Sequence, residues 1–150
     1  MSAPKILCIS GPSLQLLGTR EPEIYGRETL EEIHARLKAR AKELGATIDC
    51  RQSNHEGEIV DWIGAAKKKK YDGILLNAAA YTHTSIAIFD ALKAIAPLPC
   101  VEVHLSNPEA REAYRARSRI ARACVAKVSG FGGDSYALAL DGLVRYLRAR

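Results

Sequence analysis

The fold is decided by one stretch of the sequence, Gly73-Ile74-Leu75-Leu76-Asn77-Ala78-Ala79-Ala80-Tyr81-Thr82-His83-Thr84-Ser85. It begins as an apolar run, which is short enough for a buried strand and ends at Asn77. Polar side chains follow, and a helical pattern starts after Ser85. A strand that ends in hydrogen-bonding residues before a helix places them at the carboxyl edge of a sheet, where open α/β sheets bind ligands. This stretch is therefore predicted to form the floor of an active site.

Strands alternate with helices on both sides of this stretch. Apolar runs predict strands at 5–10, 46–51, 72–77, 100–104 and 124–129. Apolar stripes and capping residues predict helices at 28–44, about 55–68, 85–96, 109–117 and about 135–148. Five β-α units in succession predict a parallel sheet with helices on both faces.

Five strands favour an α/β, flavodoxin-like three-layer sandwich whose five-stranded parallel sheet has the order 2-1-3-4-5. Its crevice opens between strands one and three, so the loop after Ser10 faces the loop after Asn77. His104, at the end of strand four, lies next to them. The chain has 150 residues, a length that predicts a single domain over residues 1–150 with its own core.

Composition narrows the classes of partner. The chain is 47% hydrophobic and 26% charged, lacks an apolar run long enough to cross a bilayer, and starts without the apolar segment of a signal peptide. We expect a soluble, cytoplasmic protein without a membrane partner. The net charge of +5 favours anionic ligands. The one dense basic run, Lys67–Lys70, is expected in the last turn of a helix and lacks the interleaved aromatic residues of a nucleic-acid surface.

The four cysteines, Cys8, Cys50, Cys100 and Cys124, fall in or beside separate apolar segments. None belongs to a C-x-x-C pair, so they are expected to be reduced thiols that pack as small hydrophobic side chains. Because the ligand-type residues do not cluster at metal-binding spacings, no metal site is expected.

The loop from Ser13 to Gly26 is long for a connection between a strand and a helix, and such loops often act as lids. It carries Arg20 and Tyr25, with Gly18 and Gly26 as hinge candidates. A guanidinium held against a phenol favours the phenolate. Closing the lid could therefore create a base, although loop arginines and tyrosines are more often ordinary surface residues.

His104 ends a predicted strand, and Glu102 lies two residues earlier and so points to the same face. A carboxylate beside an imidazole fixes its tautomer and favours its protonated form, which suits a general acid. The alternative is a polar strand-end histidine without a catalytic role.

Arg111 and Arg115 stand four apart on the predicted helix at 109–117 and would face the same way. Two guanidiniums aimed at the crevice would clamp a carboxylate. The alternative is a solvated basic face that continues through Arg117, Arg119 and Arg122.

Five motifs follow one another along nearly the whole chain. They are the segment from Gly11-Pro12 to Tyr25-Gly26, Gln52–Gly57, Asn77 with Ala80–Ser85, Glu102–Asn107, and Gly130-Phe131-Gly132. Together they resemble the type II 3-dehydroquinate dehydratases. The resemblance implies a lyase that converts 3-dehydroquinate to 3-dehydroshikimate by anti elimination through an enolate, without a metal or a cofactor.

The resemblance also implies roles for individual residues. Tyr25 would be the general base, Arg20 its activating partner and His104 the general acid, with Glu102 in support. The implied substrate-binding positions are Asn77, His83, Leu105, Ser106 and Arg115, together with Ser13 and Arg111. Asp90 matches a residue that reaches the site of a neighbouring subunit, since members of the family form trimers that assemble into dodecamers.

Some positions depart from the family pattern. The family usually has Asn at Ser10 and Ser13, and the second of these normally helps to hold a water against the developing enolate oxygen. Asn-Pro-Gly-Ala in the family is here Asn77-Ala78-Ala79-Ala80. We therefore expect an active enzyme of the shikimate pathway or of quinate catabolism. The alternatives are a weakly active or inactive paralogue that binds a similar ligand, or another flavodoxin-like protein.

Overall fold

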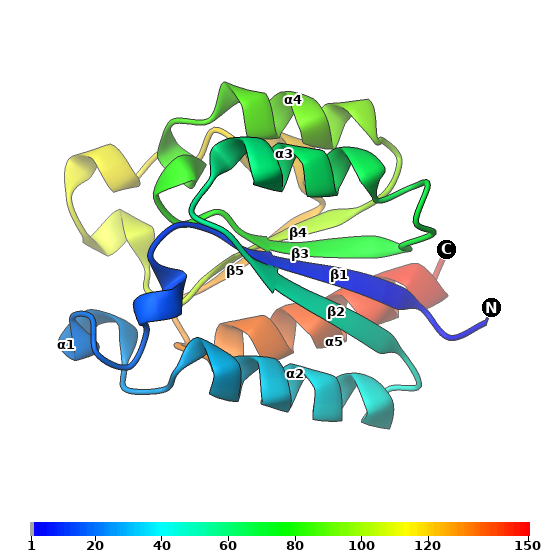
Figure 1. Ribbon diagram of the computed structural model, residues 1–150, viewed down its shortest axis with the longest axis horizontal. Helices are drawn as coiled ribbons and strands as arrows, with labels where there is room; N and C mark the ends of the chain where they lie inside the picture. Colours follow the sequence, from blue (N-terminus) through cyan, green and yellow to red (C-terminus); the bar gives the residue numbers. More distant parts are fainter. Residues whose placement is uncertain (1) are drawn as a thin grey trace.

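The computed structural model describes residues 2–150, which form one sheet with helices on both faces (Figure 1). The strands are β1 (Lys5–Ser10), β2 (Thr47–Gln52), β3 (Gly73–Asn77), β4 (Cys100–His104) and β5 (Ala126–Ser129). The helices are α1 (Pro22–Tyr25), α2 (Leu30–Glu43), α3 (Glu56–Ala65), α4 (Ile86–Ala94) and α5 (Asp134–Arg148).

The sheet has the order β2-β1-β3-β4-β5, and every neighbouring pair is parallel. Helices α2 and α5 cover one face, and α3 and α4 cover the other, so that three layers result (Figure 1). The predicted fold class and strand order are thus confirmed. In the centre of the sheet, Ser10 of β1 and Asn77 of β3 are register partners, which brings the ends of these strands together.

Two apolar cores flank the sheet, and the alternation of β4 decides which side chains enter each of them. Val101 and Val103 pack in the core beneath α2 and α5, whereas Cys100 packs in the core beneath α3 and α4. Because side chains two residues apart share a face, Glu102 and His104 lie on the side of Cys100.

The prediction of a helix at 109–117 is wrong. The segment instead contains two short 3₁₀ helices, Pro108–Ala110 and Ala113–Arg115, and the backbone is extended at Arg111 between them. A helix of this length has little stability of its own. Contacts with other loops fix this segment, including the hydrogen bond that Nδ1 of His83 donates to the carbonyl of Arg117, at 2.8 Å.

The predicted boundaries of one further helix and one strand also differ from those in the structure. Helix α3 ends at Ala65, so Lys67–Lys70 do not form its last turn but lie in the turns beyond it. The N–H of Lys69 donates to the carbonyl of Ala65, and Lys70 adopts a left-handed conformation that stops the helix. Strand β5 begins at Ala126, two residues later than expected.

Two further properties hold for the part of the chain that the structure describes. All four cysteines are free thiols, and Cys8 and Cys100 are buried. Between residues 2 and 150, the longest helices are too short or too polar to pass through a lipid bilayer.

Candidate active site

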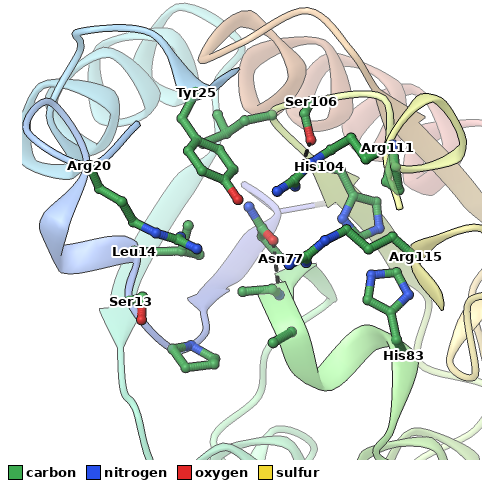
Figure 2. Close-up of a pocket in the computed structure, with 15 residues that line it drawn as sticks. Ser13, Leu14, Arg20, Tyr25, Asn77, His83, His104, Ser106, Arg111 and Arg115 are labelled. Atoms are coloured by element: carbon green, nitrogen blue, oxygen red, sulfur yellow. Dashed lines mark hydrogen bonds between the residues drawn. The ribbon is translucent and has the colours of Figure 1, made fainter. Parts of the chain in front are cut away.

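A cavity of about 100 Å³ opens at the carboxyl edge of the sheet (Figure 2). It gathers ten residues that the sequence singled out, namely Ser13, Arg20, Tyr25, Asn77, His83, His104, Leu105, Ser106, Arg111 and Arg115. Five further residues line it that the sequence reasoning did not name as site residues, namely Pro12, Leu14, Ala79, Ala80 and Pro108. Their side chains carry no chemistry of their own, so only their positions inside or directly beside the recognised motifs could have indicated them.

The lid is the segment from Ser13 to Gly26, and it brings Tyr25 and Arg20 to the cavity. Tyr25 is the last residue of α1, and its hydroxyl points into the cavity (Figure 2). The guanidinium carbon of Arg20 lies 4.6 Å from the centre of the Tyr25 ring. Gly18 and Gly26 both have left-handed φ angles, 93° and 84°, which other residues rarely adopt. The lid therefore turns at both of the expected glycines.

A second guanidinium approaches the same phenol. The guanidinium carbon of Arg111 lies 5.1 Å from the centre of the Tyr25 ring. Its Nη1 donates to the Ser106 hydroxyl at 3.4 Å, and its Nε is buried without a partner among residues 2–150. The Tyr25 ring is thus contacted by two positive side chains, of which only Arg20 was expected.

Arg115 also lines the cavity, but it does not share a helix with Arg111. Its Nε donates to the Glu112 carboxylate at 2.5 Å. The predicted clamp of two arginines on one helical face is therefore wrong in its geometry, although both side chains reach the cavity.

His104 faces Tyr25 and Arg20 across the cavity (Figure 2). Its Nε2 lies 2.5 Å from Oε2 of Glu102, whose side chain is fully buried. The Ser118 hydroxyl donates to the other oxygen, Oε1, at 3.1 Å. The expected pairing of Glu102 with His104 on one face of β4 is present, and Ser118 is a partner that the sequence reasoning missed.

Asn77 and His83 border the floor of the cavity. Asn77 Oδ1 accepts the backbone N–H of Ala79 at 3.1 Å, which fixes the amide. His83 Nδ1 lies 2.8 Å from the carbonyl oxygen of Arg117. A carbonyl can only accept, so Nδ1 carries the proton and Nε2 of the neutral ring remains an acceptor.

A buried phenol supports this floor from below. The Tyr136 hydroxyl on α5 lies 2.8 Å from the Ser10 hydroxyl, and Ser10 is the register partner of Asn77 on β3. Complete burial raises the pKa of Tyr136 well above its usual value, so the phenol stays neutral. No sequence pattern indicated this contact, because Tyr136 looks like an ordinary core residue of a helix.

Two of the departures from the family pattern fall at left-handed positions of the backbone. Ser13 has φ 67°, and Ala79 has φ 52°. Asn is enriched in this conformation, and Gly adopts it freely. The residues that the family pattern places at these positions, Asn and Gly, therefore suit the observed backbone better than Ser and Ala.

Asp90 does not line the cavity. It lies on α4 in a separate surface hollow with Arg117, Arg119 and Arg122. Ile86, at the edge of this hollow, is 60% exposed. Within residues 2–150, no group of three or more His, Cys, Asp or Glu side chains is placed to hold a metal ion.

Comparisons with known proteins agree on one family. Residues 4–144 match the family model described as dehydroquinase class II. The 3-dehydroquinate dehydratase of Phenylobacterium zucineum is 54% identical over 97% of this chain and 100% of that protein. The enzyme of the same name from Clostridium perfringens is 49% identical over 97% and 99%. The crystal structure of the type II dehydroquinase from Butyrivibrio crossotus has a TM-score of 0.93 at 41% identity, covering 95% of this chain and 99% of that one.

Proposed function

The chain belongs to the class II dehydroquinase family, and on that premise we propose that it is a hydro-lyase that converts 3-dehydroquinate to 3-dehydroshikimate. The observation that carries the proposal is one cavity in which a phenol contacted by two guanidiniums faces an imidazole held by a buried carboxylate. An anti elimination of water next to a ketone needs a base on one face of the substrate and an acid on the other.

Tyr25 takes the first proton. The carbon between the ketone and the carbon that bears the leaving hydroxyl loses its proton to the Tyr25 phenolate, and the electron pair moves to the ketone oxygen as an enolate. Arg20 and Arg111 favour the phenolate because their positive charges lie close to the ring. Without them, little of a phenol is ionised at neutral pH.

His104 gives the second proton. As the enolate collapses, the carbon–oxygen bond breaks and the departing hydroxyl takes a proton from the imidazolium, so that it leaves as water. The buried Glu102 carboxylate stabilises that imidazolium and holds the ring in place. Tyr25 and His104 enter the cavity from opposite sides, which suits an anti elimination (Figure 2).

The remaining polar residues of the cavity bind the substrate. Arg115 and the backbone N–H groups at Leu105 and Ser106 suit its carboxylate. Nε2 of His83 can accept a hydrogen bond from a ring hydroxyl, and Asn77 borders the same space. The unpartnered Nε of Arg111 also supports a ligand that accepts a hydrogen bond at this point.

Among the departures from the family pattern, Ser13 is the one expected to affect the activity most. We assign it the role of holding a water against the enolate oxygen, with a shorter reach than asparagine has. Loss of one contact of this kind costs roughly 10²–10³ in rate. This favours one second candidate, a weakly active or inactive paralogue that binds a dehydroquinate-like ligand.

A turnover assay separates these two functions. Purified protein is mixed with 3-dehydroquinate, and the rise of near-ultraviolet enone absorbance is followed for the wild type, Tyr25→Phe and Ser13→Asn. Turnover that Tyr25→Phe lowers to a small residual rate supports the lyase. Calorimetric binding without turnover, restored by Ser13→Asn, supports the paralogue, whereas neither binding nor turnover would refute both.

The pathway and the assembly are further parts of the proposal. We assign the enzyme to the shikimate pathway or to quinate catabolism, and growth of a deletion strain without aromatic amino acids or on quinate decides between them.

We also propose trimers assembled into a dodecamer, with Asp90 reaching a neighbouring site. The exposed Ile86 and the arginines around Asp90 support an interface there. Sedimentation of the wild type and of Ile86→Glu tests it.

A further inference from the structure

Ser118 lies behind the proposed general acid and not in the cavity. The residues that line the cavity include His104 but neither Glu102 nor Ser118. Ser118 reaches the site only through Glu102, on the side of β4 that faces away from α2 and α5. It belongs to the irregular segment between β4 and β5 that also carries Arg111 and Arg115.

The hydrogen bonds around Ser118 fix the direction of its hydroxyl. The backbone N–H groups of Ile120 and Ala121 both donate to its oxygen, at 3.3 and 3.1 Å. These two bonds occupy the acceptor sites of the hydroxyl oxygen. The hydroxyl proton is therefore free to donate to Oε1 of Glu102, at 3.1 Å.

The histidine donates to the same carboxylate. Glu102, as an anion, accepts one hydrogen bond from the Ser118 hydroxyl at Oε1 and a second from His104 Nε2–H at Oε2, at 2.5 Å. Glu102 is 0% exposed, so its carboxylate depends on hydrogen-bond donors of the protein. A buried carboxylate is retained as an anion only where hydrogen bonds or opposite charges compensate its lost hydration.

We propose that Ser118 is a positioning residue for His104, because it holds the buried Glu102 as an anion that accepts a hydrogen bond from Nε2–H and leaves Nδ1 to serve the substrate. The proposal rests on the proposed lyase function for its kinetic test only. Ser118 touches neither substrate nor reacting atoms, and its effect passes through one carboxylate.

Kinetics separate this role from a purely structural one. Ser118→Ala is expected to lower kcat by about tenfold or more, as expected for loss of a hydrogen bond to a charged group, and to leave KM within about twofold. Ser118→Thr keeps the hydroxyl and is expected to restore kcat. If Ser118 merely anchored the segment that carries Arg111 and Arg115, KM would rise at unchanged kcat, and this outcome would overturn the proposal.

Tyr71→Phe is the matched control. The Tyr71 hydroxyl also donates to a carboxylate, that of Asp49, at 2.6 Å, but Tyr71 precedes β3 at its amino end and does not line the cavity. Its loss is expected to lower the melting temperature and to leave kcat unchanged. An equal loss of kcat in Tyr71→Phe and Ser118→Ala would overturn the specific role of Ser118.

A spectroscopic measurement keeps the test independent of activity. In protein labelled with ¹⁵N-histidine, the Nε2-bound proton of His104 is expected to shift in Ser118→Ala and to return to its wild-type position in Ser118→Thr. An unchanged signal would overturn the proposal even if the enzyme turned over. If Ser118→Ala does not fold, Ser118→Cys replaces it, because its thiol is a weak donor of similar size. Absence of wild-type turnover would refute the lyase function and leave this measurement valid.

Discussion

Arg20 is expected to act through Tyr25, and the geometry gives the size of the effect. Its guanidinium carbon lies 4.6 Å from the ring centre. This distance sets the scale: at an effective dielectric constant of about 20, two unit charges about 4–5 Å apart interact by about 3–4 kcal/mol. Two features reduce this value, since the Arg20 side chain is 29% exposed and the Glu21 carboxylate lies 3.8 Å from its Nε. We therefore expect about 2 kcal/mol, or a factor of about 30.

The perturbation is Arg20→Met, which removes the charge and keeps an unbranched side chain. It is made in the wild type and in Tyr25→Phe, and kcat is measured from the rise in enone absorbance. We expect a loss of about 30-fold with Tyr25 present and of less than about threefold in Tyr25→Phe, because interacting residues are not additive. Arg27→Met, at an exposed residue just after the lid, should change kcat little and serves as the control.

Equal losses from Arg20→Met in both backgrounds would refute the reasoning. Arg20 would then stabilise the substrate or the enolate directly, and the phenol would not need its charge. A loss that appears in KM alone would assign Arg20 to substrate binding.

Three other predictions follow from particular contacts. Glu102→Gln keeps the shape of the side chain but removes its charge, so kcat should fall by about 10²-fold; kcat within twofold of the wild type would contradict a role for the charge. Ala79→Gly removes a left-handed alanine and should stabilise the fold by about 0.5–1 kcal/mol, raising the melting temperature by about 1–4 °C. An unchanged or lower melting temperature would count against strain at this position. Tyr136→Phe leaves the buried Ser10 hydroxyl unpaired and should lower the free energy of unfolding in urea by about 1–3 kcal/mol. Ser10→Ala in the same protein should recover part of this loss. Full additivity of the two substitutions would argue against their hydrogen bond.

The sheet and the edge that carries the site were predictable from sequence because they depend on local patterns. Apolar runs of the right length placed the five strands, and their order placed Ser10, Asn77 and His104 together. The helix at 109–117 was not predictable in the same way. Its residues favour a helix locally, but the backbone is extended at Arg111, whose side chain contacts Tyr25 on the distant lid and Ser106 five residues earlier.

Contacts between distant segments account for the other omissions. The second guanidinium at Tyr25, the Ser118 hydroxyl at Glu102 and the Tyr136 phenol beside Ser10 each join residues from separate elements. Single-residue patterns carry no information on such pairs. The resemblance to a family identified which residues matter, while the structure identified what each of them touches.

The acid and the base of the proposed reaction are held in different ways. His104 ends a buried strand, and its partner Glu102 is fixed by Ser118 and by the core around it. Tyr25 lies on a four-residue helix that has no buried residue, and Arg20 belongs to the same lid. The acid is therefore organised before a ligand arrives, whereas the base depends on how the lid packs against Arg111. Substitutions in the lid should consequently change the base step, while substitutions behind β4 should change the departure of water.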